Sequence, residues 1–118
     1  MADTALVIGW TRPVRGREPR ASTVFGEGVA LWTKLQGNGA IESWEAFFLE
    51  PHGGDLGGFF LLRGERDRLA ALRSSEEFDR FVGRAMMVVD GLGVVAAATG
   101  PRIAELMERF QANAAELA

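Results

Sequence analysis

Two predicted strands of this sequence carry large apolar residues at adjacent positions, in the runs Phe47-Phe48-Leu49 and Phe59-Phe60-Leu61-Leu62. Successive side chains of a β-strand point to opposite faces of the sheet, so each run places apolar groups on both faces. An uncovered patch of that size is unusual in a soluble monomer. Both faces therefore need a cover, and a second copy of the chain is the simplest cover for the face that helices leave open.

The apolar periodicity along the chain predicts the element order β–α–β–β–α–β. We expect strands over residues 5–11, 41–50, 59–63 and 92–99. We expect amphipathic helices over residues 19–37 and 76–89, and a short helix over 67–73. This order is the ferredoxin-like plan of an α+β domain. Its antiparallel sheet has the second and fourth strands at the edges and the two main helices on one face.

A further helix is predicted after this core, which spans residues 5–99. Gly100-Pro101 favours a helix start, because proline suits the first helical position. The helix is expected over residues 101–117, with an apolar stripe formed by Ile103, Leu106, Met107, Phe110, Ala114 and Leu117. A plain ferredoxin-like unit does not need this helix, so the stripe should be buried on the chain's own helical layer or on a partner. We expect residues 1–118 to form one domain.

Local signals predict where the two preceding helices begin and which sides they bury. Asp67 is expected to cap the short helix. Ser74, with Glu77 three residues later, has the capping-box pattern expected at the start of the next one. The buried stripe of that next helix is predicted to be Phe78, Phe81, Val82, Ala85, Met86 and Val89.

The chain contains no cysteine, which excludes disulfides, thiolate nucleophiles and cysteine-ligated metal sites. We therefore expect a reducing, cytoplasmic setting. The N-terminal segment lacks the basic region of a signal peptide, and no run approaches the ~20 apolar residues of a membrane helix, so no membrane association is expected. A net charge of −3 does not supply the basic surface that nucleic-acid binding requires, so no nucleic-acid partner is expected.

Glu45 and Arg63 are charged residues inside otherwise apolar strands. Alternation places Glu45 on one face with Phe47, and Arg63 on one face with Phe59, so an even hairpin register makes the two charges neighbours. Inside a barrel they would form the polar floor of a ligand pocket, because buried charges need partners. Near the strand ends they would be ordinary rim charges. Trp44 joins them as a candidate ligand contact, the alternative being a core or interface anchor.

His52 is the only histidine, so any imidazole chemistry depends on it. It lies in the Gly-rich linker 51–58, where a loop residue without a chemical role is the alternative. Glu50 and Asp55 lie nearby, but one histidine without cysteine does not make a strong metal pattern. No metal and no cofactor are expected. A group of arginines after the first strand forms either a lip that attracts an acidic ligand or a solvated loop. These are Arg12, Arg15, Arg17 and Arg20.

Three stretches look like uncharacterised bacterial members of the dimeric α+β barrel superfamily, whose members pair two ferredoxin-like sheets into a closed barrel. They are Leu69–Phe78, Leu49–Asp55 and Asp90–Val95. The resemblance covers residues 5–99 through the order and length of the elements, and it implies a homodimer. The superfamily includes small monooxygenases, lactone isomerases, ligand-sensing modules and haem enzymes with a histidine ligand. A Gly-rich hairpin is a poor place to hold His52 as such a ligand, and a fold this widely used implies no single function.

Two hypotheses for the function follow. In the first, a homodimeric barrel binds a small organic molecule in its interior, with or without monooxygenase-like or isomerase-like chemistry that needs no cofactor. In the second, the chain is a non-catalytic structural or regulatory module, and its inner sheet face is only dimer core. A solvent-open cavity of roughly 300 Å³ or more with a few polar groups favours the first. A barrel packed solid by Phe47, Phe48, Phe59 and Phe60 favours the second.

Overall fold

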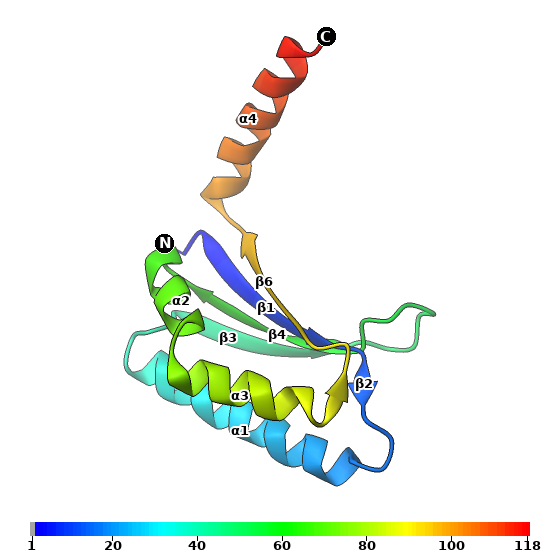
Figure 1. The fold of residues 1–118 in the computed structure, drawn as a ribbon. Coiled ribbons are helices and arrows are strands. Elements are labelled where there is room, and N and C mark those ends of the chain that lie inside the picture. Colours follow the sequence, from blue (N-terminus) through cyan, green and yellow to red (C-terminus); the bar gives the residue numbers. More distant parts are fainter. Residues whose placement is uncertain (1) are drawn as a thin grey trace.

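The computed structural model describes residues 2–118 and shows a four-stranded antiparallel sheet with helices packed on one face (Figure 1). The strand order is β3-β4-β1-β6, so the strands predicted to be second and fourth do form the sheet edges. This confirms the ferredoxin-like prediction. Within one chain the sheet is open, with both edges unpaired among the described residues. The four strands are β1 (Thr4–Trp10), β3 (Ser43–Phe48), β4 (Gly58–Gly64) and β6 (Gly93–Ala98).

One side of this sheet is covered by α1 (Glu18–Gly37), α2 (Arg66–Arg73) and α3 (Glu76–Met86) (Figure 1). Helix α4 (Pro101–Glu116) follows the last strand. The structure also contains a two-stranded pairing of β2 (Arg12–Pro13) with β5 (Val89–Asp90), which the sequence did not predict. Two-residue strands are too short to show a periodicity of two. No helix within residues 2–118 has the length and hydropathy to cross a membrane.

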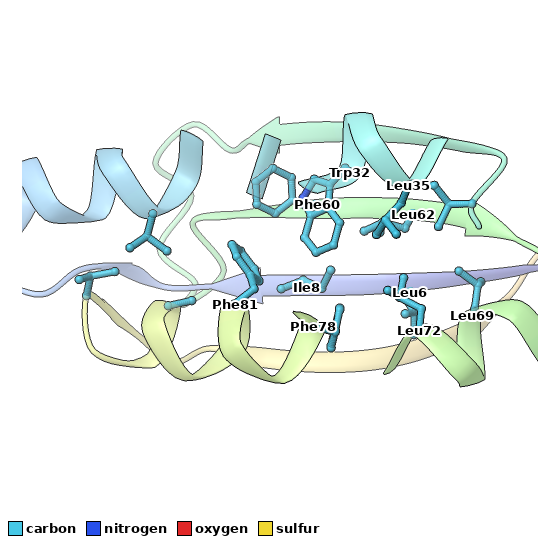
Figure 2. Packing of buried hydrophobic residues seen from close by; sticks show 14 residues of the cluster. Leu6, Ile8, Trp32, Leu35, Phe60, Leu62, Leu69, Leu72, Phe78 and Phe81 are labelled. Carbon is cyan, nitrogen blue, oxygen red and sulfur yellow. The ribbon is translucent and has the colours of Figure 1, made fainter. Parts of the chain in front are cut away.

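The hydrophobic core lies between the sheet and helices α1, α2 and α3 (Figure 2). β1 and β4 contribute alternate residues to it, and Trp32 of α1 packs its ring against Phe60 and Phe81 at centroid distances of 5.6 and 5.1 Å. Gly28 lets α1 approach closely, because a Cβ atom there would lie 2.9 Å from Phe81 Cε1 and 3.2 Å from Phe60 Cε2. The largest fully buried side chains are Trp32, Phe60, Leu6, Ile8, Leu62 and Leu69.

The ends of α2 and α3 differ in detail from the prediction. Ser75 caps α3, since its hydroxyl accepts a hydrogen bond from the Phe78 N–H at 3.2 Å, whereas the expected capping box began one residue earlier. The residue before α2 is Glu65, which makes no side-chain cap, so Asp67 lies in the first turn instead. Helix α3 ends at Met86 rather than Val89 because the N–H groups of residues 11 and 14 donate to the carbonyls of residues 90 and 88, and residues 89–90 pair as a strand instead. Met86, the last residue of α3, is 63% exposed, whereas the prediction placed it in the buried stripe.

The other face of the sheet is covered by no helix of the described chain (Figure 1). The observed pairings place Val7 opposite both Leu61 and Val95, and Phe47 opposite Phe59. The Phe47 and Phe59 rings stack at 4.7 Å. We call this surface the bare face; it is formed by Val7, Ser43, Glu45, Phe47, Phe59, Leu61, Arg63, Val95 and Ala97, while Ala5 on the same side of β1 is already buried.

Candidate functional site

A cleft of about 420 Å³ opens on the helix-facing side of the sheet, between α1, α3 and the end of β1. Most of its lining is apolar. Glu18, Ser22 and Phe48, which are exposed, connect it to solvent. Its volume lies in the range of ordinary small-molecule sites. The walls include Trp10, Phe25, Phe48, Phe60, Ala21 and Ala85.

Four aromatic side chains form one wall of the cleft. Phe25 of α1 stacks on Phe60 at a centroid distance of 4.9 Å and an interplanar angle of 21°. Phe25 also lies 5.2 Å from Phe48, and Trp10 lies edge-on to Phe60 at 5.4 Å. These separations are those of favourable aromatic pairs. The wall therefore offers flat, apolar surface for the body of an organic molecule.

Small residues on the helices account for the open space. Ala21 of α1 and Ala85 of α3 both face the cleft from positions where larger side chains would fill it. A bidentate ion pair holds the two helices together nearby. Arg84 Nε and Nη2 donate to Glu27 Oε1 and Oε2 at 2.7 and 2.8 Å. The hydrogen bond from Arg84 lowers the pKa of the Glu27 carboxyl below its ordinary value.

Polar groups gather at the mouth rather than in the cleft. Glu18 and Ser22 lie in the first turns of α1 and are both exposed. The Glu18 carboxylate already accepts a hydrogen bond from the Gly16 N–H at 2.9 Å. The Ser22 hydroxyl thus supplies a donor or acceptor for a ligand that lies against the aromatic wall.

The arginines predicted to form a lip lie in the segment that leads to this mouth. Arg17 Nη1 donates to the Met87 carbonyl at 2.6 Å, and Arg12 Nε lies 3.6 Å from Asp90 Oδ2. These two side chains therefore fasten the β2 segment to the chain around β5. Arg15 and Arg20 are exposed and keep their charges in solvent near the cleft.

The structure does not bring the four sequence-predicted site residues together. Glu45 and Arg63 are same-face neighbours on the bare face, with Arg63 Nε 3.9 Å from Glu45 Oε1 and side chains 41% and 53% exposed, respectively. Trp44 faces the helices, with its ring 6.4 Å from that of Phe60. His52 lies in the loop between β3 and β4. None of the four is among the residues that line the cleft.

His52 fastens its own loop. Its Nε2 lies 2.8 Å from the Leu56 carbonyl, and its Nδ1 accepts from the Gly54 N–H at 3.3 Å. This pattern fits the neutral tautomer with the proton on Nε2. Both ring nitrogens are thus engaged within the loop. Across residues 2–118, no group of three or more His, Asp or Glu side chains is arranged to hold a metal ion.

Sequence reasoning assigned the aromatic residues of the cleft to core or interface and missed the cleft itself. One signal was present. The inward positions of α1 and α3 carry Ala21 and Ala85 at the end near Trp10, whereas large residues such as Trp32 and Phe78 occupy the other end. Small residues at one end of two facing helices leave space over the sheet.

Comparison with known proteins shows the fold. No protein-family model matches the chain, and no curated protein is similar to it in sequence. Among solved structures, a DABB family protein with a ferredoxin-like fold from Mesorhizobium loti has a TM-score of 0.66 at 9% identity, covering 85% of this chain and 99% of its own. A dimeric ferredoxin-like protein of unknown function from Jannaschia sp. has a TM-score of 0.63 at 14% identity, covering 81% and 98%. A putative antibiotic biosynthesis monooxygenase from Chloroflexus aurantiacus has a TM-score of 0.53 at 12% identity, covering 82% and 93%. The chain thus has the ferredoxin-like fold.

Proposed function

We propose that this protein is a homodimer that binds a small organic molecule with an apolar body in the cleft between α1, α3 and the sheet. The observation that carries the proposal is the aromatic-walled cleft of about 420 Å³. Ligand sites are typically concave, mostly apolar and supplied with a few polar groups. Here Ser22 and Glu18 at the mouth are those groups.

The homodimer is proposed from the bare face. Its central row runs from Glu45 through Leu61 and Val7 to Val95, so three of four side chains are apolar. A second copy covers this row and turns two open sheets into a closed barrel without edges. Dimeric ferredoxin-like proteins of similar structure support the proposal. The absence of cysteine keeps the cytoplasm as the proposed compartment.

The proposed site differs in place from a barrel interior. In the dimer the stacked rings of Phe47 and Phe59 occupy the space between the two sheets, while the cleft lies on the outer, helix-covered side of each sheet. Each copy then carries its own site. Similarity to a putative monooxygenase supports an oxidation in which dioxygen is the oxidant and the bound molecule supplies the electrons, one oxygen atom entering the molecule and the other leaving as water. This chain orients the apolar body and shields it from bulk solvent.

Filling the cleft should weaken ligand binding at least tenfold without affecting the fold. Ala21→Phe places a ring in the cleft, whereas Ala30→Phe adds the same ring at an exposed position of α1. We expect the neutral fluorescent probe N-phenyl-1-naphthylamine to bind the native protein and Ala30→Phe equally, and Ala21→Phe at least tenfold more weakly. Fluorescence titration measures the affinities. Equal binding by all three proteins would mean that the cleft is not the site.

The same titration separates an acidic from a neutral ligand. If Arg15 and Arg20 attract an acidic group, the anionic probe 8-anilinonaphthalene-1-sulfonate binds more weakly after Arg15→Ala with Arg20→Ala, and its binding falls with added salt. The affinity of the neutral probe stays unchanged.

Native mass spectrometry of the protein purified from its own host tests for a bound molecule directly. A mass larger than that of two chains would indicate one.

Glu45 and Arg63 should interact more strongly in the dimer than in the monomer. The pair is half-exposed in one chain, where such pairs contribute about 0–1 kcal/mol. A second copy on the bare face removes water from the pair. Arg63→Met alone then leaves the Glu45 carboxylate buried without a partner, while Arg63→Met with Glu45→Gln leaves no unpaired charge. We expect a double-mutant cycle on urea stability to give a coupling of about 1–3 kcal/mol. Effects that add within about 0.3–0.5 kcal/mol would place the pair outside the interface.

A further inference from the structure

We infer that α4 is a clasp that packs its apolar stripe against a second copy of this chain. This inference rests on the proposed homodimer and adds to it the segment that completes the interface. The stripe is formed by Ile103, Leu106, Met107, Phe110, Ala114 and Leu117.

The apolar stripe of α4 has no cover among the described residues, and only Arg102 in the first turn is half-buried. None of its residues is buried, and Met107 and Phe110 in the middle of the stripe are 49% and 66% exposed. The opposite side of the helix carries Glu105, Glu108 and Glu116. A helix with one apolar and one charged side is typical of helices that pack on another surface. Of the two covers expected for the stripe, the chain's own helical layer does not cover it in the structure, which leaves a partner.

An unsupported helix of this length is marginal in water, because most helical stability in proteins comes from packing. The helix also makes the molecule extended. The radius of gyration is 16.4 Å, against about 13.5 Å for a compact chain of this length. Both features indicate that α4 is stable only when another surface packs against its apolar stripe.

The direction of α4 points to a second copy. It leaves the end of β6 and projects away from the sheet on the side opposite α1 and α3, which is the side of the bare face (Figure 1). Two sheets that pack face to face lie about 10 Å apart, and 16 helical residues span about 24 Å. If a second copy packs on the bare face, α4 of the first copy is long enough to run along the side of the second copy, past the second sheet and as far as its helices.

The area of the bare face is too small without α4. Four strands of about six residues cover roughly 20 by 20 Å, or about 400 Å², whereas a stable interface buries about 800 Å² per partner. A stripe roughly 10 Å wide along α4 adds about 240 Å², and the partner's helix covers an equal area in return. Together the surfaces amount to roughly 900 Å² per copy, which is enough for a stable dimer.

The test compares charged substitutions on the two sides of α4 in the full chain. Met107→Glu with Phe110→Glu changes the stripe, and Ala112→Glu with Ala115→Glu adds the same charge on the other side. We expect sedimentation equilibrium to show a dimer dissociation constant raised at least tenfold by the first pair and less than twofold by the second. Equal effects of the two pairs would overturn the clasp.

A crosslink identifies what the stripe touches. Because the chain has no cysteine, Ala114→Cys and Ala112→Cys each give a single site for a photoreactive maleimide, on the stripe and on the opposite side. Irradiation should give a two-chain product from Ala114→Cys and little from Ala112→Cys. A crosslink within one chain, or none in a protein that sediments as a dimer, would overturn the clasp and leave the homodimer standing. A native protein that sediments as a monomer would overturn both the clasp and the homodimer.

Discussion

Val95→Glu is expected to convert the dimer into a monomer without unfolding it. Val95 is 58% exposed in the single chain and lies opposite Val7 in the bare face, so a glutamate there is solvated until a second copy covers it. Burying an unpaired charge costs about 3 kcal/mol or more, and two-fold symmetry buries two in each dimer. The dissociation constant should therefore rise by about four orders of magnitude. Sedimentation equilibrium across the micromolar range measures it.

Met86→Glu is the matched control. Met86 is 63% exposed and belongs to α3, on the side of the sheet away from the bare face, so the same change there should leave the dimer intact. A dimer that survives Val95→Glu would show that the second copy does not use the bare face. A native protein of 12.8 kDa in the same experiment would exclude the barrel altogether.

Trp32→Ala is expected to remove about 3–5 kcal/mol from the free energy of unfolding. The Trp32 side chain is 0% exposed and contacts three phenylalanine rings from β4 and α3. Its loss leaves a cavity that α1 and α3 cannot close, because Gly28 already brings α1 close to Phe81. Since small domains are stable by only about 5–15 kcal/mol, the variant should be largely unfolded at moderate urea concentration, measured by circular dichroism at fixed protein concentration.

Trp44→Ala serves as the comparison for this change. Trp44 is half-buried, and the ring nearest to it, that of Phe60, lies 6.4 Å away, so its removal should cost clearly less. Trp32→Phe should also cost less than Trp32→Ala. It keeps an aromatic ring and deletes the Trp32 Nε1 group, which is buried without a hydrogen-bond partner within residues 2–118. Equal losses for Trp32→Ala and Trp44→Ala would contradict the packing described here.

The sheet was predictable because its signals are local and strong. Continuous apolar runs and alternation placed β1, β3, β4 and β6 correctly, and the same alternation made Glu45 and Arg63 neighbours. The short β2–β5 pairing was not predictable, because it depends on backbone hydrogen bonds between residues 11–14 and 88–90. The sequence of a two-residue segment does not indicate which distant segment it pairs with.

The cleft could not be predicted in the same way. Periodicity tells which side of an element is apolar, but an empty volume depends on side-chain sizes that meet from separate parts of the chain. Ala21 and Ala85 come from different helices, and Trp10 from the end of a strand. Only the fold brings their small and large side chains to one place. The apolar character of both sheet faces directed the prediction to the space between two sheets instead.

Strand β4 has apolar side chains on both faces, and this leaves its alignment with its neighbours unusually dependent on two residues. A slip of one residue exchanges the faces of a strand, and here it would exchange Phe59 with Phe60 and Leu61 with Leu62, at little cost in apolar burial. At one end the slip puts a side chain where Gly58 lies, and a Cβ atom there would be 2.6 Å from the Phe47 carbonyl oxygen. At the other end it turns Arg63 into the core without a partner. Gly58 and Arg63 thus fix the pairing of β4, and substitutions at these positions open a route to misaligned strands that changes at Phe59 or Phe60 do not.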